Sequence, residues 1–139
     1  RSTLFPYTTL FRSPYSSRVT NVSRHEGKVM SATFQLEGQE FIALNGGPLF
    51  KFTEAVSFFV KCGTQEEVDT FWDKLSAGGQ TQQCGWLKDK YGLSWQIIPT
   101  ALGEMLQDKD GAKAGRVMQA MLKMVKIDIK TLQQAYEGR

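Results

Sequence analysis

The residue types that most often carry catalysis or bind metals are scarce in this sequence. His25 is the single histidine, and Cys62 and Cys84 are the two cysteines. His25 precedes the dipeptide Glu26-Gly27, where we expect an exposed turn histidine rather than a metal ligand. A nucleophilic cysteine needs a base or a cation beside it, and no histidine or arginine is near Cys84 in the sequence. These residues therefore indicate neither metal nor nucleophilic chemistry.

Polar residues on one strand are better candidates for a site. Asp89 begins the turn Asp89–Gly92, and we expect its carboxylate to cap backbone amides there rather than to act as a general base. In the strand that follows, alternation places Ser94 and Gln96 on one face, with Ile98. The opposite face carries Leu93, Trp95 and Ile97. A few polar groups in an apolar concavity are typical of a small-molecule site. The alternative is that Ser94 and Gln96 satisfy each other or water inside a filled sheet.

The first half of the chain has the pattern of antiparallel strands. Val29–Glu37 alternates as a half-buried strand, and Gly38 turns it into a second strand, Glu40–Asn45. The expected buried residues of the first of these strands are Met30, Ala32, Phe34 and Leu36. Arg18–Arg24 is a weaker strand candidate ahead of the hairpin, and Gly46-Gly47-Pro48 ends the group.

The second half begins with a strand, a helix and further strands. Ala55–Cys62 is rich in Val and Phe, as strands are. Thr64 and Glu67 form a capping box that predicts a helix start. The buried stripe of this helix is expected to be Val68, Phe71, Trp72 and Leu75, and Gly78-Gly79 ends it. Trp86 begins another strand, and Leu93–Ile98 forms the last one before Pro99.

The sequence after Pro99 is helical in pattern. Thr100 is expected to cap Ala101–Leu106, and Asp128 to cap the final helix. Between them, Ala112–Lys126 is predicted to be one helix. Its apolar face is expected to be Val117, Met118, Met121, Leu122 and Val125. Methionines fill irregular gaps, so this stripe predicts packing rather than a cofactor site.

The composition is that of an ordinary globular protein. Of 139 residues, 41% are hydrophobic and 22% charged. No apolar run has the roughly 20 residues that cross a bilayer, so we expect no membrane partner. The net charge of +3 is mild and the lysines are scattered, which makes nucleic acid an unexpected partner. Two cysteines without CxxC spacing predict no disulfide framework, and the chain is expected to be cytoplasmic and reduced.

The N-terminal segment does not fit the pattern of the rest. Arg1–Ser13 lacks the apolar region and cleavage site of a signal peptide and has no strand or helix period. It resembles a translated sequencing adaptor, with a natural Ser/Thr/Arg-rich targeting leader as the alternative. We therefore expect a non-native or disordered leader over residues 1–17 and a single domain over residues 18–139.

Three blocks of sequence and a faint internal repeat carry a family resemblance. The blocks are Phe41–Pro48, Glu66–Leu75 and Cys84–Gln96, and the repeat pairs Gly38–Leu44 with Gly92–Ile98. In this order the blocks resemble the PhnB-like branch of the vicinal-oxygen-chelate superfamily, which includes glyoxalases, bleomycin-resistance proteins and dioxygenases. Members of the branch are often labelled 3-demethylubiquinone-9 3-methyltransferase. The sequence lacks the glycine-rich strand-to-helix turn of a nucleotide-type cofactor site, so the residues themselves do not support that label.

The resemblance implies an α+β fold of paired βαβββ modules with C-terminal helices, a cleft between the modules and a homodimer. The opening strand and helix of the first module have no counterpart in the pattern, so we expect that module to be incomplete. In metal-dependent members, a carboxylate would fall at Gln96 and a histidine near Ala55. Because neither residue here is a good ligand, we expect no metal and no cofactor.

The cleft residues follow from the same resemblance. If Gln96 points as the family's ligand does, Ser94 faces the cleft with it, and Ser57, Phe59 and Lys61 do so by the same register. The predicted ligand-binding residues are Asn45, Ser57, Phe59, Trp86, Ser94 and Gln96. The expected function is metal-independent binding of a small organic ligand. The alternatives are an enzyme of the same fold (an isomerase, dioxygenase or transferase) and a resistance-type protein that sequesters a toxic compound.

Overall fold

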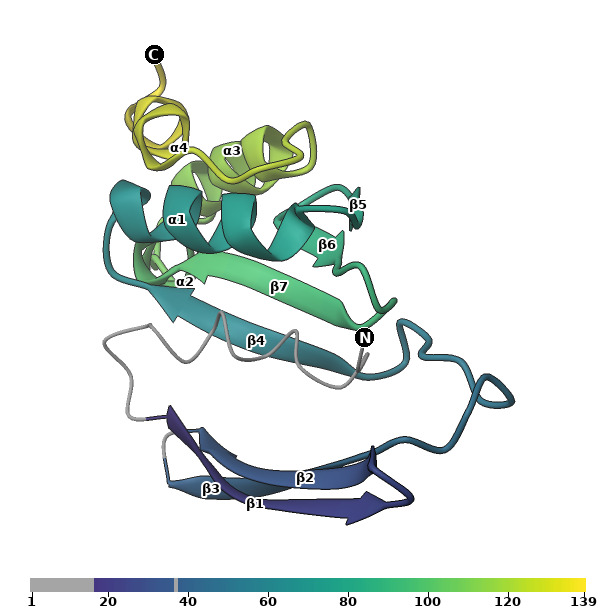
Figure 1. The fold of residues 1–139 in the computed structure, drawn as a ribbon. Helices are drawn as coiled ribbons and strands as arrows, with labels where there is room; N and C mark the ends of the chain where they lie inside the picture. The colour runs from purple at the N-terminus through teal and green to yellow at the C-terminus, as the bar shows by residue number, and fades with distance from the viewer. Residues whose placement is uncertain (1–16, 37) are drawn as a thin grey trace. The chain divides into compact units, whose positions relative to one another are not determined.

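Two units make up the chain in the computed structural model, Arg1–Lys51 and Phe52–Arg139, and the structure describes residues 17–36 and 38–139. The seven strands and four helices of the described residues make an α+β arrangement, as predicted. The expected leader lies outside the described residues, apart from Ser17, the first residue of strand β1. The order of elements follows the paired-module pattern, and each unit is described by itself below (Figure 1).

The described part of the first unit is a three-stranded antiparallel sheet. Its strands are β1 (Ser17–His25), β2 (Lys28–Leu36) and β3 (Gln39–Leu44), in the order β1-β2-β3. Gly27 and Gly38, both with positive φ, lie in the two turns, as the sequence predicted. Phe34 stacks on Phe41 across β2 and β3, with ring centroids 5.5 Å apart. This stacking fixes the register of the hairpin.

The prediction that Met30 of β2 is buried is wrong. Ala32 and Phe34 are buried, but Met30 is 42% exposed and Val29 is buried in its place. The pairing with β1 shifts at this point, from Ser23 opposite Ser31 to Arg24 opposite Val29. Met30 is therefore the extra residue of a β-bulge, and the inward and outward sides of the strand exchange there.

The second unit contains a complete βαβββ module. It runs through β4 (Ser57–Cys62), α1 (Gln65–Ser76), β5 (Gln80–Thr81), β6 (Trp86–Lys88) and β7 (Ser94–Pro99). The sheet order is β4-β7-β6-β5, with β4 parallel to β7 and the other pairs antiparallel. The parallel pair requires a crossover, which α1 supplies. The strands β1, β2 and β3 of the first unit match the three-stranded end of this module.

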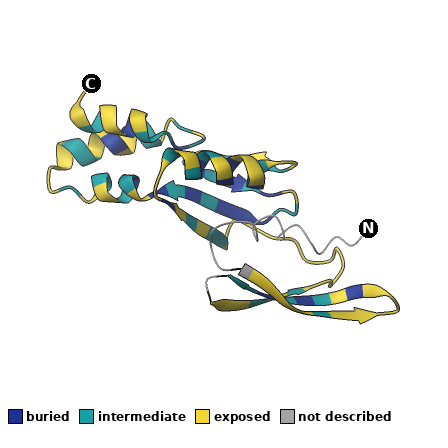
Figure 2. Ribbon diagram, turned by 60° about the vertical axis from the view of Figure 1, so that its left-hand side comes forward, coloured by how far each residue is buried: buried dark blue, intermediate teal, exposed yellow. Residues whose placement is uncertain are grey.

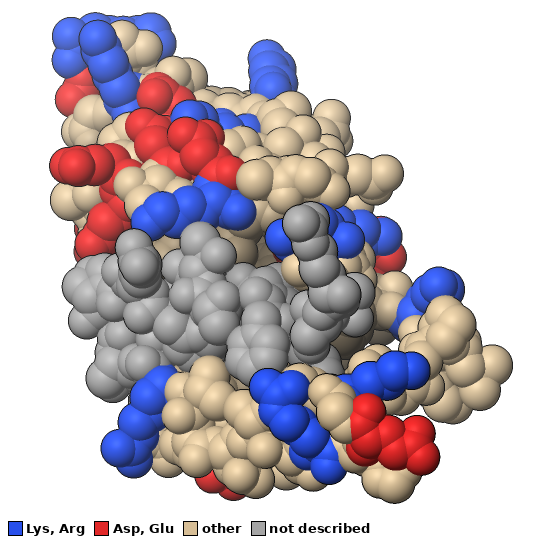
Figure 3. Space-filling view, viewed as in Figure 1, with Lys and Arg blue, Asp and Glu red and all other residues tan. Residues whose placement is uncertain are grey.

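Helix α1 covers one face of the four-stranded sheet. Thr64 is its N-cap and its hydroxyl accepts from the Glu67 amide at 3.2 Å, as the capping box predicted, while the Glu67 carboxylate accepts from the Gly63 amide. The predicted stripe of Val68, Phe71, Trp72 and Leu75 is buried. Beneath it, Phe58 and Trp95 meet edge to face at 5.1 Å. Figure 2 shows the buried residues concentrated along β7. Figure 3 shows acidic side chains gathered over the first turns of α1, where their negative charge interacts favourably with the helix dipole and stabilises the helix.

Three helices follow β7, and they correct the predicted cap of the first helix and the predicted end of the second. They are α2 (Thr100–Leu106), α3 (Gly111–Met121) and α4 (Ile129–Glu137). Thr100 does not cap α2; it is the first helical residue, and its hydroxyl donates to the Cys62 carbonyl at 3.5 Å. Asp128 does cap α4, as predicted. None of the described helices combines the length and apolar character that a membrane crossing requires.

The predicted helix Ala112–Lys126 ends earlier than expected, at Met121. The carbonyls of Met124 and Val125 accept hydrogen bonds from the amides of Cys84 and Gly85, which lie in another loop. These two hydrogen bonds hold Met124 and Val125 against that loop, so α3 does not continue through them. The apolar stripe is consequently split. Val117 is buried with Leu102, Ile127 and Leu132, whereas Met118, Leu122 and Val125 are exposed.

Candidate functional site

Most of the predicted site residues lie on the face of the second unit's sheet that is opposite α1. Ser94 pairs with Ser57 on β4 and with Lys88 on β6, and Gln96 pairs with Phe59 and Trp86 in the same way. Paired residues of neighbouring strands project to the same face. Two rows of side chains therefore cross β6, β7 and β4. We call Lys88, Ser94 and Ser57 the polar row, and Trp86, Gln96 and Phe59 the aromatic row.

A hydrogen bond links the two rows. The Gln96 amide nitrogen donates to the Ser57 hydroxyl at 2.9 Å, across β7 and β4. Of the alternative raised by the sequence, that Ser94 and Gln96 bond to each other or to water, the first part does not occur, because Gln96 bonds to Ser57 and the Ser94 hydroxyl has no partner among the described residues. The bond uses one amide proton and leaves the Gln96 amide oxygen as an acceptor on this face.

Ser94 is the least satisfied group of the site. Its residue is fully buried, at 0% exposure, and its hydroxyl has no hydrogen-bond partner among the described residues. A buried hydroxyl without a partner costs roughly 1–3 kcal/mol. Such groups are uncommon in folded proteins and call for an explanation such as a bound ligand or water. Ser94 therefore marks the centre of the polar row as a place for a further polar group.

An ion pair ends the polar row. Lys88 Nζ lies 2.5 Å from Glu54 Oε1, and the two side chains are 24% and 51% exposed. The hydrogen bond from Lys88 lowers the pKa of the Glu54 carboxyl. Sequence reasoning missed both residues. The signal for Lys88 was its position two residues after Trp86 on the same strand, whereas Glu54 lies in a loop that has no period to read.

Asn45 belongs to the first unit, whereas the two rows belong to the second. Its side-chain amide donates to the Val29 carbonyl at 3.3 Å, and its backbone amide donates to the Met30 carbonyl at 2.8 Å. These bonds extend the β2–β3 pairing past the end of β3. In the structure Asn45 is a strand-end residue, and its place in the ligand site stays a prediction.

The Asp89 turn fixes the alignment of the rows. Asp89 Oδ1 accepts from the amides of Tyr91 at 2.8 Å and Leu93 at 3.1 Å, and its Oδ2 accepts from the Trp95 indole at 3.1 Å. The prediction that this carboxylate caps backbone amides is confirmed. Because the turn joins β6 to β7, it sets Lys88 opposite Ser94.

Comparison with known proteins shows the family. Residues 3–98 match the family model of 3-demethylubiquinone-9 3-methyltransferase. The PhnB protein of Bacillus cereus, described as such a methyltransferase, has 36% sequence identity, and the match covers 70% of this chain and 88% of that one with a TM-score of 0.61. This chain belongs to the PhnB-like family. A Staphylococcus aureus protein matches at 24% identity over 65% of this chain and 77% of its own, but its TM-score of 0.28 supports no structural argument. A search of curated proteins gave no match.

The PhnB-like assignment raises the question of a metal, because the wider superfamily chelates substrate oxygens through one. The described residues contain no group of three or more His, Cys, Asp or Glu side chains placed to hold an ion. His25 is exposed beside Glu26, at the turn where it was expected. Cys84 donates its thiol to the Met121 carbonyl. Gln96, where the resemblance implies a carboxylate in metal-dependent members, is a neutral amide. The donor set on this face does not suit a divalent cation.

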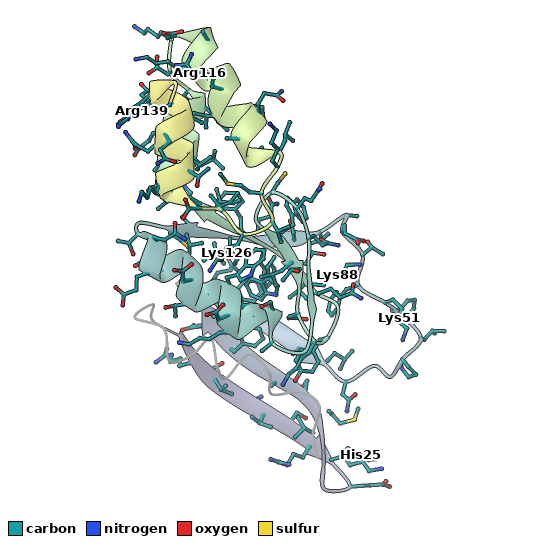
Figure 4. The ribbon with its side chains drawn as sticks, turned by 90° about the horizontal axis from the view of Figure 1, so that it is seen from above. His25, Lys51, Lys88, Arg116, Lys126 and Arg139 are labelled. Carbon is teal, nitrogen blue, oxygen red and sulfur yellow. The ribbon has the colours of Figure 1, made fainter. Side chains whose placement is uncertain are left out.

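A groove lies in the C-terminal helices of this PhnB-like chain. A groove of about 680 Å³ runs between α3 and the end of α4, with Arg116 and Arg139 at its side (Figure 4). Arg116 donates to the carbonyls of Ala135 at 2.9 Å and Tyr136 at 2.8 Å, so it closes the end of α4. The groove thus contains a helix-capping arginine rather than a set of converging reactive groups.

Proposed function

We propose that this PhnB-like chain binds a small organic ligand on the polar and aromatic rows of the second unit's sheet. The observation that carries the proposal is the buried, unpartnered Ser94 hydroxyl at the centre of the polar row. Around it, the two rows offer hydroxyls, an amide and two aromatic side chains on one face. Few polar groups among apolar and aromatic surfaces are the usual composition of a small-molecule site.

We further propose that ligand binding needs no metal ion and that the protein works as a homodimer in the cytoplasm. The neutral Gln96 amide at the family's carboxylate position supports the first point. Ile42 and Leu44 on the edge strand β3 are 68% and 69% exposed, and apolar side chains on an open edge favour association with a second copy. Cys62 and Cys84 are both free, which fits a reducing compartment.

Ligand-observed NMR with a library of small acids, amides and phenols tests the binding site. We expect binders whose saturation-transfer signal falls in Gln96→Leu, because the amide would no longer face the ligand. Gln133→Leu, an exposed change on α4, should leave the signal unchanged. Binders that are indifferent to Gln96→Leu would place the site elsewhere, and a library without binders would count against the proposed function.

A further inference from the structure

The ion pair at the end of the polar row has the form of a ligand contact. Glu54 lies outside the sheet, in the segment before β4, yet its carboxylate meets Lys88 on the face that carries the two rows. Lys88 is labelled in Figure 4, on the strand beside β7. Ion pairs that solvent can reach are weak and open readily. A carboxylate of a ligand would find the same cation with the same geometry.

A second observation points to the same kind of group. Ser94 lies directly opposite Lys88 in the β6–β7 register, and its hydroxyl is buried without a partner among the described residues. A cation and a buried hydroxyl without a partner, on adjacent strands, could together bind one anionic oxygen, the first through an ion pair and the second by donating a hydrogen bond. The Glu54 carboxyl bonds to Lys88 and also to the Gln82 side chain, but not to Ser94, so the present arrangement leaves the Ser94 hydroxyl unused.

The aromatic row defines the remainder of the ligand. Trp86 and Phe59 flank Gln96 at two strand spacings from each other, roughly 9.6 Å between backbones. Phe59 is 53% exposed, although it is a large aromatic residue. A flat ring placed over Gln96 would meet aromatic surface on both sides. The polar row lies two residues along the strand, roughly 6.6 Å away, which is within the reach of a short acid substituent and the long Lys88 side chain.

We propose that this face binds an aromatic carboxylate, with the ring over Gln96 and the carboxylate between Lys88 and Ser94, and that Glu54 occupies Lys88 until the ligand displaces it. The inference rests on the proposed function and narrows its ligand class. Glu54 is in this view an internal competitor. It keeps Lys88 paired in the free protein. The affinity for anions is then the intrinsic affinity multiplied by the fraction of molecules in which Lys88 is free of Glu54.

Calorimetry with an isosteric pair of probes, 2-naphthoate and 2-naphthamide, tests the inference on the full chain. The native protein should bind 2-naphthoate at least about tenfold more tightly than 2-naphthamide. Equal affinities would overturn the carboxylate assignment and leave the proposed function standing. If neither probe binds, the aromatic carboxylate class is wrong, and the proposed function is judged by its own library screen.

Variants separate the roles of Lys88 and Glu54. Lys88→Met should abolish the preference for 2-naphthoate, whereas Lys74→Met, at an exposed lysine on α1, should keep it. Glu54→Gln should raise the affinity for 2-naphthoate by about threefold or more and leave 2-naphthamide unchanged, because it removes the competing charge. A Glu54→Gln variant that binds 2-naphthoate no better overturns the competition, and this variant keeps the inference testable if Lys88→Met does not fold.

Discussion

Replacing Asp89 with alanine should destabilise the second unit more than any other single change in a turn described here. The carboxylate accepts three hydrogen bonds, from the amides of Tyr91 and Leu93 and from the Trp95 indole. Leu93 and Trp95 are 5% and 3% exposed, so water cannot easily replace the lost acceptor at these two donors. A buried donor left unsatisfied costs roughly 1–3 kcal/mol, which gives roughly 2–6 kcal/mol for the two.

This cost is large against the total stability of a domain, which is typically about 5–15 kcal/mol. Asp89→Asn should lie between the native protein and Asp89→Ala. Its amide oxygen still accepts from the backbone amides at Oδ1, but its amide group presents a donor to the Trp95 indole nitrogen, which is also a donor. One buried bond is lost, at roughly 1–3 kcal/mol.

Urea unfolding, followed by far-ultraviolet circular dichroism, measures these differences. Asp73→Asn, an exposed carboxylate on α1, is the matched control and should change the free energy of unfolding by less than about 0.5 kcal/mol. Asp89→Asn as stable as the native protein would refute the donor-to-donor argument. Asp89→Ala no less stable than the control would refute the whole account of the turn.

Three further outcomes are expected. Burial, and secondarily the Glu67 carboxylate, raise the pKa of the Cys62 thiol from about 9.0 to about 11. The folded state therefore holds this proton more tightly, so the contribution of Cys62 to stability should be constant below pH 9 and fall between pH 9 and about 11. Cys62→Ala should remove this part of the fall in a pH series of urea unfolding curves and leave the part that comes from Tyr136, whose hydrogen bond to Asp108 raises its pKa. Arg116→Met should lower the free energy of unfolding by about 1 kcal/mol, because the carbonyls of Ala135 and Tyr136 lose their donor, whereas Lys123→Met, at an exposed lysine just after α3, should not. Thermal melts with Zn²⁺, Mn²⁺, Mg²⁺ or Ni²⁺ should show no shift, since an ion that binds the folded state raises the melting temperature.

The strand alternation of the second unit could be predicted from the sequence because it has a period of two. Leu93–Ile98 and Ala55–Cys62 each divide into an apolar face and a mixed face, and the helix pattern between them requires the apolar faces to lie under α1. Ser57, Phe59, Ser94 and Gln96 were therefore assigned to one face, where the structure places them. Trp86 joins them through the β6–β7 register.

Features set by contacts between distant segments could not be predicted in this way. The end of α3 depends on the amides of Cys84 and Gly85, which bond to carbonyls about forty residues later in the chain. The exposure of Met30 depends on a bulge that one strand alone does not show. Both errors came from extending a local period past a point where a long-range hydrogen bond ends it.

The candidate site itself combines both kinds of feature. Alternation determines which face a side chain occupies, but the pairing of Lys88 with Ser94 depends on the Asp89 turn, which lies between them in the sequence. Glu54 reaches Lys88 from a loop without any period. The buried Asp89 carboxylate thus fixes the position of the polar row, and the exposed Glu54 carboxylate forms an ion pair with Lys88 at the end of that row. The two carboxylates have opposite roles, because Asp89 is buried and holds the register, whereas Glu54 is exposed and can leave.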